Sequence, residues 1–137
     1  MKNIVIDCNV FISAFIGSET CFKALDKAFS HYQVCYSDAT LQELLEVLKR
    51  PKFRNLLKNR RIEATLELLY SFGNRFSPKP CHIKLPDPDD LIYLDLSITA
   101  NAEYIITGNK KHFPEKLCSG IKVLSPGEFL GINAKSP

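Results

Sequence analysis

The chain opens with Met1-Lys2-Asn3-Ile4-Val5-Ile6-Asp7-Cys8-Asn9-Val10, and this stretch decides the fold. Its β-branched run Ile4–Ile6 is typical of a short strand buried on both faces, as the strands of a parallel sheet are. Ligands of parallel α/β sheets bind just beyond the carboxyl ends of the strands, where this strand would deliver Asp7. The alternative is that Asp7 only forms a turn or caps a helix, which aspartates after strands often do.

Outward from this strand, apolar runs alternate with apolar residues at helical spacing. Further strands are predicted at residues 32–36, 104–107 and 121–124. Helices are predicted at residues 11–16, 21–29, 41–48, 61–72 and 91–98, with a short capped helix after Ser125. Residues 74–88 contain four prolines and are predicted to be a connection with one short edge strand. The alternation predicts an α/β fold, a three-layer α/β/α arrangement with a central, mostly parallel sheet.

Composition is ordinary for a globular protein. The 137 residues fit a single domain, predicted over residues 1–132 with 133–137 as a flexible tail, and the net charge of +3 is mild. The five cysteines are scattered and form no C-x-x-C pair, which favours reduced thiols over disulfides or a zinc site. The sequence shows neither a signal peptide nor an apolar run of about 20 residues. We therefore expect a soluble, cytoplasmic protein without a membrane partner.

Polar groups follow the predicted strands and meet at one edge of the sheet if the strands are parallel. They are the carboxylates of Asp7, Glu43 and Asp90 and the amide of Asn109. Carboxylates brought together repel one another, and a divalent cation is the usual remedy. Oxygen ligands without a His or Cys partner favour Mg²⁺ or Mn²⁺ over zinc. Such a metal can activate water for attack on a phosphodiester.

Each acid also has a purely structural interpretation. Asp90 and its neighbours Asp87 and Asp89 stand where acids cap a helix and favour its dipole. Glu43 lies off the leucine stripe of its helix, with Glu46 on the same polar side, and the pattern does not choose between them. The joint placement of the acids, more than any single one, favours a functional site.

The chain resembles a PIN domain, specifically the VapC-like toxin components of that family. The matching pieces, in order along the chain, are Val5–Val10, Ser37–Leu44 continuing to Leu48–Phe53, Asp87–Asp90, Ala102–Asn109 and Leu124–Phe129. The resemblance implies a metal-dependent endoribonuclease whose catalytic and metal-binding acids are Asp7, Glu43 and Asp90. It selects Glu43 over Glu46, and it makes Asn9 and Thr107 polar supports. An RNA substrate, a cognate antitoxin and a homodimer are its implied partners.

One position departs from this family pattern. Many PIN domains have a fourth acid just after the Thr-Gly turn, and here Asn109 stands there, followed by Lys110, Lys111 and His112. An asparagine can still bind a metal through its carbonyl or hold a metal-bound water, but it brings no negative charge. Asp87 or Asp89 could supply the missing charge. The departure motivates an alternative function, a catalytically weak PIN module that binds RNA or a protein partner. A haloacid-dehalogenase-type phosphohydrolase is disfavoured because Asn9 replaces the second acid of its Asp-x-Asp pattern.

Basic residues cluster after the third predicted helix and after the Thr-Gly turn. Candidate RNA contacts are Lys49, Arg50, Lys52, Arg54, Lys110 and Lys111, because clustered cations attract a phosphate backbone. Phe53 lies within the first cluster and could stack on an unpaired base or pack into the core. The three histidines are too dispersed to predict a metal site, and Cys8, expected to point away from Asp7 along the strand, is predicted to fill the core.

Overall fold

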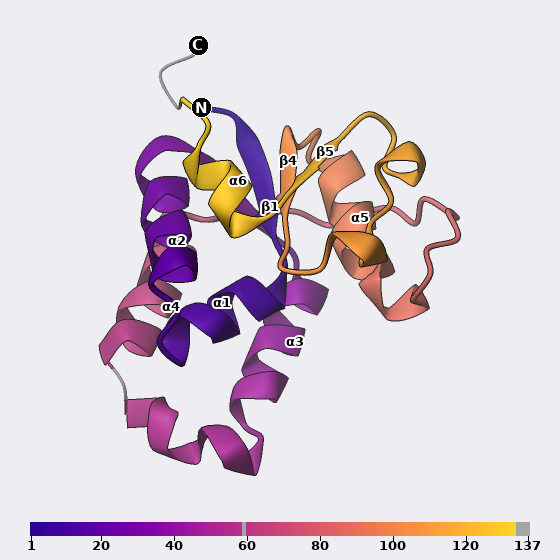
Figure 1. The fold of residues 1–137 in the computed structure, drawn as a ribbon. Coiled ribbons are helices and arrows are strands. Elements are labelled where there is room, and N and C mark those ends of the chain that lie inside the picture. Colours follow the sequence, from indigo (N-terminus) through magenta and orange to yellow (C-terminus); the bar gives the residue numbers. More distant parts are fainter. Residues whose placement is uncertain (59, 134–137) are drawn as a thin grey trace.

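A computed structural model describes residues 1–58 and 60–133 and shows a five-stranded sheet between layers of helices (Figure 1). The strands are β1 Asn3–Ile6, β2 Gln33–Tyr36, β3 Asn74–Arg75, β4 Tyr104–Ile106 and β5 Lys122–Leu124. The α-helices are α1 Cys8–Phe15, α2 Glu19–His31, α3 Asp38–Leu48, α4 Arg60–Phe72, α5 Leu91–Thr99 and α6 Pro126–Leu130. Shorter 3₁₀ segments are η1 Pro51–Lys58, η2 Pro88–Asp90, η3 Lys110–His112 and η4 Glu115–Leu117.

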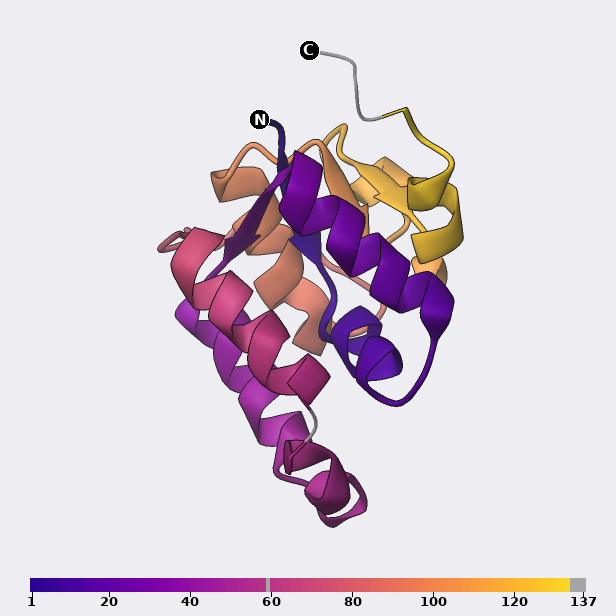
Figure 2. The same ribbon diagram turned by 90° about the vertical axis from the view of Figure 1, so that its left-hand side faces the viewer.

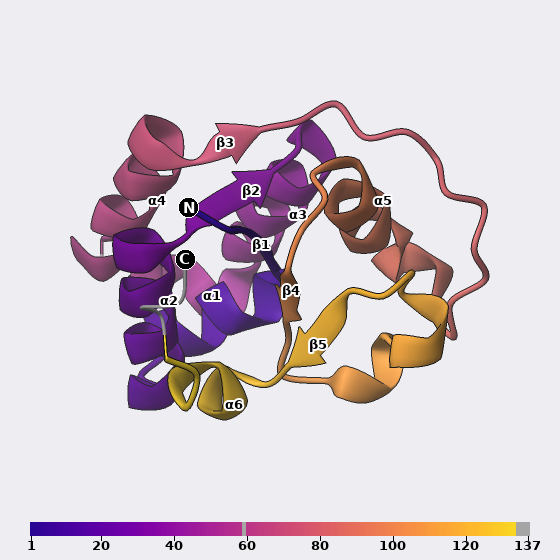
Figure 3. The same ribbon diagram turned by 90° about the horizontal axis from the view of Figure 1, so that it is seen from above.

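The sheet has the order β3-β2-β1-β4-β5, and every pair of neighbouring strands is parallel. Helix α5 packs against β1, β2 and β4 on one face, and α2 lies with α1 and α6 on the other (Figure 3). The predicted three-layer α/β/α fold is therefore confirmed. The strand order reverses between β1 and β4, and this switch point is where open α/β sheets bind their ligands.

Local sequence explains several helix starts. Ser37 caps α3 in a capping box with Thr40, and Ser125 caps α6 in a capping box with Glu128. The short edge strand predicted after the fourth helix is β3, which begins directly after Gly73. A Cβ atom at Gly73 would lie 2.3 Å from the Leu69 carbonyl oxygen, so this tight exit from α4 needs glycine.

The predicted start of the first helix and the predicted strand position of Cys8 were wrong, whereas the environment of Phe53 had been left open. The first helix begins at Cys8 rather than near Phe11, because Asp7 caps it as soon as β1 ends. Cys8 is therefore helical rather than part of the strand, although it is 4% exposed and fills the core as predicted. Phe53 is 7% exposed, so it packs into the core and is not available to stack on a base.

Residues 134–137, most of the predicted tail, lie outside the described residues. Across the part of the chain that the structure describes, no helix combines the length and apolar character needed to cross a membrane.

Candidate active site

Asp7 lies at the switch point, at the carboxyl end of β1. Its Oδ1 accepts a hydrogen bond of 3.4 Å from the Asn9 backbone N–H, which caps α1, and its Oδ2 accepts one of 2.9 Å from the Thr107 hydroxyl. Thr107 reaches Asp7 because Ile6 and Ile106 are paired in register on β1 and β4. Burial raises the pKa of Asp7, while these hydrogen bonds and the charge of His112 act to lower it. Asp7 therefore caps α1 and also places a carboxylate at the edge of the sheet formed by the carboxyl ends of the strands.

Asn9 supports Asp7 through its backbone, while its own side chain is exposed. Thr107 is fully buried, and its hydroxyl oxygen also accepts a 3.1 Å hydrogen bond from the backbone N–H of Asn109. The structure therefore places both predicted polar supports beside Asp7. One acts through its backbone and the other through its side chain.

Asp90 stands at the N-cap position of α5, yet its side chain makes no capping hydrogen bond in the described structure. Asp87 performs that role for the preceding η2 turn, accepting a 3.0 Å hydrogen bond from the backbone N–H of Asp89. The Oδ2 atom of Asp90 is buried and has no hydrogen-bond partner among the described residues. The side chain of Asp90 therefore does not cap α5 by a hydrogen bond.

The surroundings of Asp90 disfavour its charge. Burial raises its pKa to about 6, with His112 acting in the opposite direction and the charges of Asp7, Asp87 and Glu43 adding to the rise. The carboxylates of Asp7 and Glu43 therefore lie within electrostatic reach of Asp90. The three carboxylates come from segments that are about 35 to 85 residues apart in sequence.

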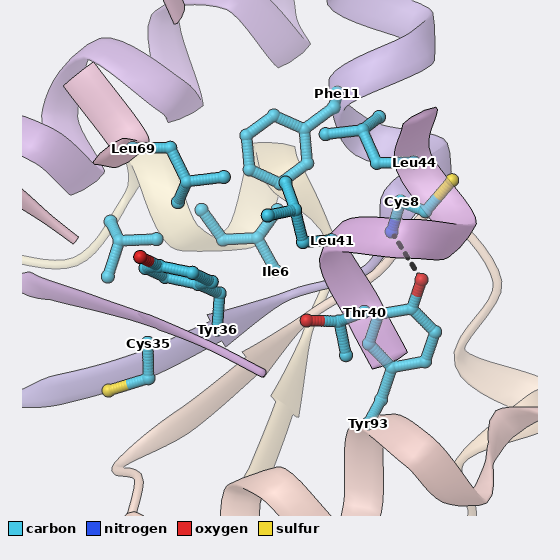
Figure 4. Close-up of a pocket in the computed structure, with 11 residues that line it drawn as sticks. Ile6, Cys8, Phe11, Cys35, Tyr36, Thr40, Leu41, Leu44, Leu69 and Tyr93 are labelled. Atoms are coloured by element: carbon cyan, nitrogen blue, oxygen red, sulfur yellow. Dashed lines mark hydrogen bonds between the residues drawn. The ribbon is translucent and has the colours of Figure 1, made fainter. Parts of the chain in front are cut away.

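Glu43 faces this edge through a contact with Tyr93, which sequence reasoning missed. The Tyr93 hydroxyl donates a short hydrogen bond to Glu43 Oε1. It also accepts a hydrogen bond of 3.3 Å from the Cys8 backbone N–H, which Figure 4 shows. Tyr93 is 1% exposed, and burial raises its pKa, so the hydroxyl keeps its proton and remains a donor. Glu46, by contrast, is exposed and accepts a hydrogen bond from Gln42.

Behind this contact lies a cavity of about 20 Å³, which is room for a single water molecule (Figure 4). Cys8 lines it, and burial, with the charges of Glu43 and Asp7, raises the pKa of the Cys8 thiol to about 12. A thiol with so high a pKa is a poor nucleophile at neutral pH. Its charge state agrees with the predicted role as core filler.

His112 also lies at this edge, although the three histidines were predicted to be too dispersed to form a metal site. Its Nδ1 lies 3.0 Å from Asp90 Oδ2, within ion-pair distance but without hydrogen-bond geometry. Its Nε2 lies 3.0 Å from Asn109 Nδ2. Asn109, where a fourth acid was expected, therefore contacts His112 and Thr107. The one available signal was the position of His112 shortly after the strand that delivers Thr107.

The donor set suits a hard divalent cation. Carboxylate oxygens from Asp7, Glu43 and Asp90 are the ligands that Mg²⁺ and Mn²⁺ prefer, and a cation would satisfy the buried Oδ2 of Asp90. The site is not preformed, however. Within residues 1–58 and 60–133, no three His, Cys, Asp or Glu side chains are arranged closely enough to hold a metal ion.

The basic candidates fall into two places. Lys49, Arg50 and Lys52 are exposed near the end of α3, and Figure 2 shows η1 at the end of α3 and α4 that points away from the sheet. The side chain of Arg54 lies outside the described residues. Lys111 is exposed beside the carboxylate edge, whereas Lys110 forms an ion pair of 2.9 Å with Glu128. The two clusters therefore form separate surfaces.

Comparisons with known proteins agree with this fold. A protein-family model described as a PIN domain matches residues 3–111. Among solved structures, the chain is similar to one in the crystal structure of VapBC2 from Rickettsia felis bound to a DNA fragment from their promoter. The TM-score is 0.62 at 16% sequence identity, and the match covers 90% of this chain and 98% of that one. A search of curated proteins gave no significant match.

Proposed function

The chain belongs to the PIN domain family, and from this premise we propose that it is a divalent-metal-dependent endoribonuclease and the toxin of a toxin–antitoxin pair. The observation that carries the proposal is the carboxylate edge. Burial, together with the nearby charges of Asp7 and Glu43, raises the pKa of Asp90. The buried Oδ2 atom of Asp90 also lacks a hydrogen-bond partner among the described residues. A divalent cation relieves both the repulsion and the unsatisfied oxygen.

In this proposal Asp7 and Asp90 hold Mg²⁺ or Mn²⁺, and Glu43 completes the site. A cation bound there would neutralise charge on the scissile phosphodiester and lower the pKa of a bound water. The chain's own residues set the geometry. Thr107 holds Asp7 by a hydrogen bond, and Tyr93 holds Glu43 while it is itself bonded to the backbone at Cys8.

Substrate binding is assigned to the exposed cations nearest the carboxylates. Lys111 lies four residues beyond Thr107, which adjoins the buried strand β4, so it can contact a phosphate next to the cleaved bond. Lys110 contributes less, because Glu128 already neutralises it. The cluster of Lys49, Arg50 and Lys52 would contact the RNA farther along, with Arg54 as a further candidate.

A cognate antitoxin and a homodimer are the proposed protein partners. The proposal is supported by the solved structure of VapBC2 bound to a DNA fragment, which contains a chain with this fold, and the match covers 98% of that chain. We propose that residues 1–132 form the nuclease domain and that the protein acts in the cytoplasm.

Cleavage of RNA by the purified protein tests the enzyme directly. We expect structured RNAs to be cut in the presence of Mg²⁺ or Mn²⁺, and Asp7→Asn to abolish the cutting. Glu46→Gln is the matched control, because Glu46 is an exposed acid of the same helix as Glu43. Undiminished cleavage by Asp7→Asn would refute the assigned site. In cells, expression of the wild type but not of Asp90→Asn should arrest growth.

A second function, a catalytically weak PIN module that binds RNA or a protein, is favoured by one observation. The described residues offer no preformed group of three metal ligands, and Asn109 stands where a fourth acid was expected. Calorimetric titration separates the two functions. Failure of the wild type to bind Mn²⁺ at millimolar concentration would favour the binding module.

A further inference from the structure

The His112 side chain lies against an oxygen of Asp90 that has no hydrogen-bond partner among the described residues. This oxygen, Oδ2, is buried, and His112 Nδ1 lies 3.0 Å from it, at ion-pair distance. On the far side of the ring, the Asn109 amide nitrogen lies 3.0 Å from Nε2. Because Nε2 accepts a hydrogen bond from this amide, the ring proton is on Nδ1 and lies on the side of Asp90.

A divalent cation and this ring compete for the same side of Asp90 Oδ2. A ring nitrogen that carries a proton cannot bind a metal, and its N–H repels a cation that approaches the same oxygen. The ring must therefore turn away before a cation binds Oδ2. The arrangement of the other donors agrees with this, because within residues 1–58 and 60–133 no three His, Cys, Asp or Glu side chains are placed closely enough to hold a metal ion.

The chain on both sides of His112 is held in place, whereas the contact of its side chain is weak. Lys110 forms its ion pair with Glu128, and Phe113 is 1% exposed and packs edge-on against the Tyr93 ring. The His112 side chain between them is 39% exposed, and its contact with Asp90 lacks the direction of a strong hydrogen bond. Rotation about the side-chain bonds of His112 is therefore enough to uncover Oδ2 while η3 stays in place.

We propose that His112 is an autoinhibitory latch: its imidazole occupies Asp90 Oδ2 and must turn away before a divalent cation binds there. The inference rests on the proposed function for the cation, and it adds a control on when the site accepts one. Because the cation binds when the ring is turned away, its apparent affinity is lower than the intrinsic affinity by the fraction of molecules in that position. Removal of the imidazole therefore strengthens metal binding, whereas removal of a residue that held Asp90 in place for the metal would weaken it.

Calorimetric titration with Mg²⁺ and Mn²⁺ tests the latch without any assay of activity. We expect His112→Ala to bind both cations about three- to tenfold more tightly than the wild type, because the contact no longer competes with the cation. Titration at about pH 8 keeps Asp90 ionised, since its pKa is about 6. Two controls should bind as the wild type does: Lys116→Ala, which removes an exposed cation from η4, and His31→Ala, which alters an exposed histidine at the end of α2.

Nuclear magnetic resonance of ¹⁵N-histidine-labelled protein follows the ring itself. In the wild type we expect saturating Mg²⁺ to shift the His112 ring signals, which are assigned by their loss in His112→Ala, and to leave those of His31 unchanged. His112 ring signals that stay in place while Mg²⁺ binds would contradict the latch. Thermal unfolding checks that the variants fold, and His112→Ser is a second variant, with the same expected gain in affinity, should His112→Ala not fold.

The sign of the change in affinity decides between the outcomes. Weaker or unchanged metal binding by a folded His112 variant overturns the latch and leaves the proposed nuclease standing. Metal binding by the variant but not by the wild type supports a latch that is closed in nearly all molecules. If neither the wild type nor any His112 variant binds a cation, the proposed function fails together with this inference.

Discussion

The carboxylates of Asp7 and Asp90 lie at the same edge of the sheet but differ in their hydrogen-bond partners. Asp7 caps α1 and accepts a hydrogen bond from Thr107, so both of its oxygens have protein partners. Asp90 occupies a cap position without capping, and its buried Oδ2 has no hydrogen-bond partner in the described structure. The fold therefore gives Asp7 two hydrogen bonds, whereas it gives Asp90 Oδ2 only the ion-pair contact with His112.

This difference teaches how to separate structural acids from functional ones. A buried carboxylate without hydrogen bonds destabilises the fold, and it persists where function requires it. Asp7 serves both purposes, so its burial and hydrogen bonds alone say little about catalysis. Asp90 is the stronger pointer to a ligand.

The largest expected effect is a loss of activity that Asp7 and Asp90 have in common, in spite of their different hydrogen bonds. If both acids hold the metal, Asp7→Asn and Asp90→Asn each lower RNA cleavage by about 10³-fold, which is about 4 kcal/mol in transition-state stabilisation. Initial rates with Mn²⁺ measure this, with Glu46→Gln as the control. Retention of more than a tenth of the activity by Asp90→Asn would remove Asp90 from the site.

The second effect separates the two acids by stability. Asp7→Ala leaves the Thr107 hydroxyl and the Asn9 N–H without their acceptor, and we expect it to lower the free energy of unfolding by about 1–3 kcal/mol. Asp90→Ala removes a carboxylate whose charge is disfavoured, so without metal it should leave stability unchanged or raise it by about 1 kcal/mol. Urea unfolding in a chelator measures both. Equal losses from the two variants would contradict the contrast drawn here.

A third, smaller effect concerns the residue that holds Glu43. Tyr93→Phe keeps the buried ring but removes the hydroxyl bonded to Glu43 and to the Cys8 N–H. We expect a loss of about 1 kcal/mol in stability and about tenfold in kcat with little change in KM. Ser97→Ala is a suitable control, because it deletes another buried hydroxyl of α5 that bonds only to the Tyr93 carbonyl among the described groups. If Ser97→Ala lost as much kcat as Tyr93→Phe, the loss in Tyr93→Phe would reflect lower stability and not the missing bond to Glu43.

The smallest effect distinguishes the two lysines beside the acids. Lys111→Ala should weaken binding of single-stranded RNA a few-fold and reduce the slope of log affinity against log salt by about 0.7. Lys110→Ala should change both less, because Glu128 is already its partner. Fluorescence anisotropy over a range of salt concentrations measures the slopes. A larger effect from Lys110 would show that RNA displaces Glu128.

Local chemistry made much of the fold predictable. The apolar run of β1 and the Ser125–Glu128 capping box are encoded within a few residues, and each appears in the structure. The start of α1 was missed because the helical spacing of apolar residues begins at Phe11, whereas the helix already begins directly after its cap, Asp7. The burial of Phe53 was left open, because a single aromatic among cations has no periodicity from which to read its environment.

The candidate site was predictable only in part. The acids at the strand ends followed from the parallel sheet, but the choice of Glu43 over Glu46 needed the family resemblance, since both lie on the polar side of one helix. In the structure, Tyr93 from α5 reaches Glu43, while the side chain of Glu46 accepts a hydrogen bond from Gln42. Tyr93 carried no signal of its own, because an aromatic residue in an apolar helix is ordinarily core.

The sequence by itself determined that a buried strand ends in Asp7 and that a parallel sheet brings further acids to the same edge, because strand burial and helix capping are local properties. Only the tertiary structure decided what surrounds each acid. His112 meets Asp90 across 22 residues of chain, and Tyr93 meets Glu43 across 50. Such contacts depend on how α3, α5 and the segment after β4 pack around the switch point, and that packing determines which carboxylate is left unsatisfied.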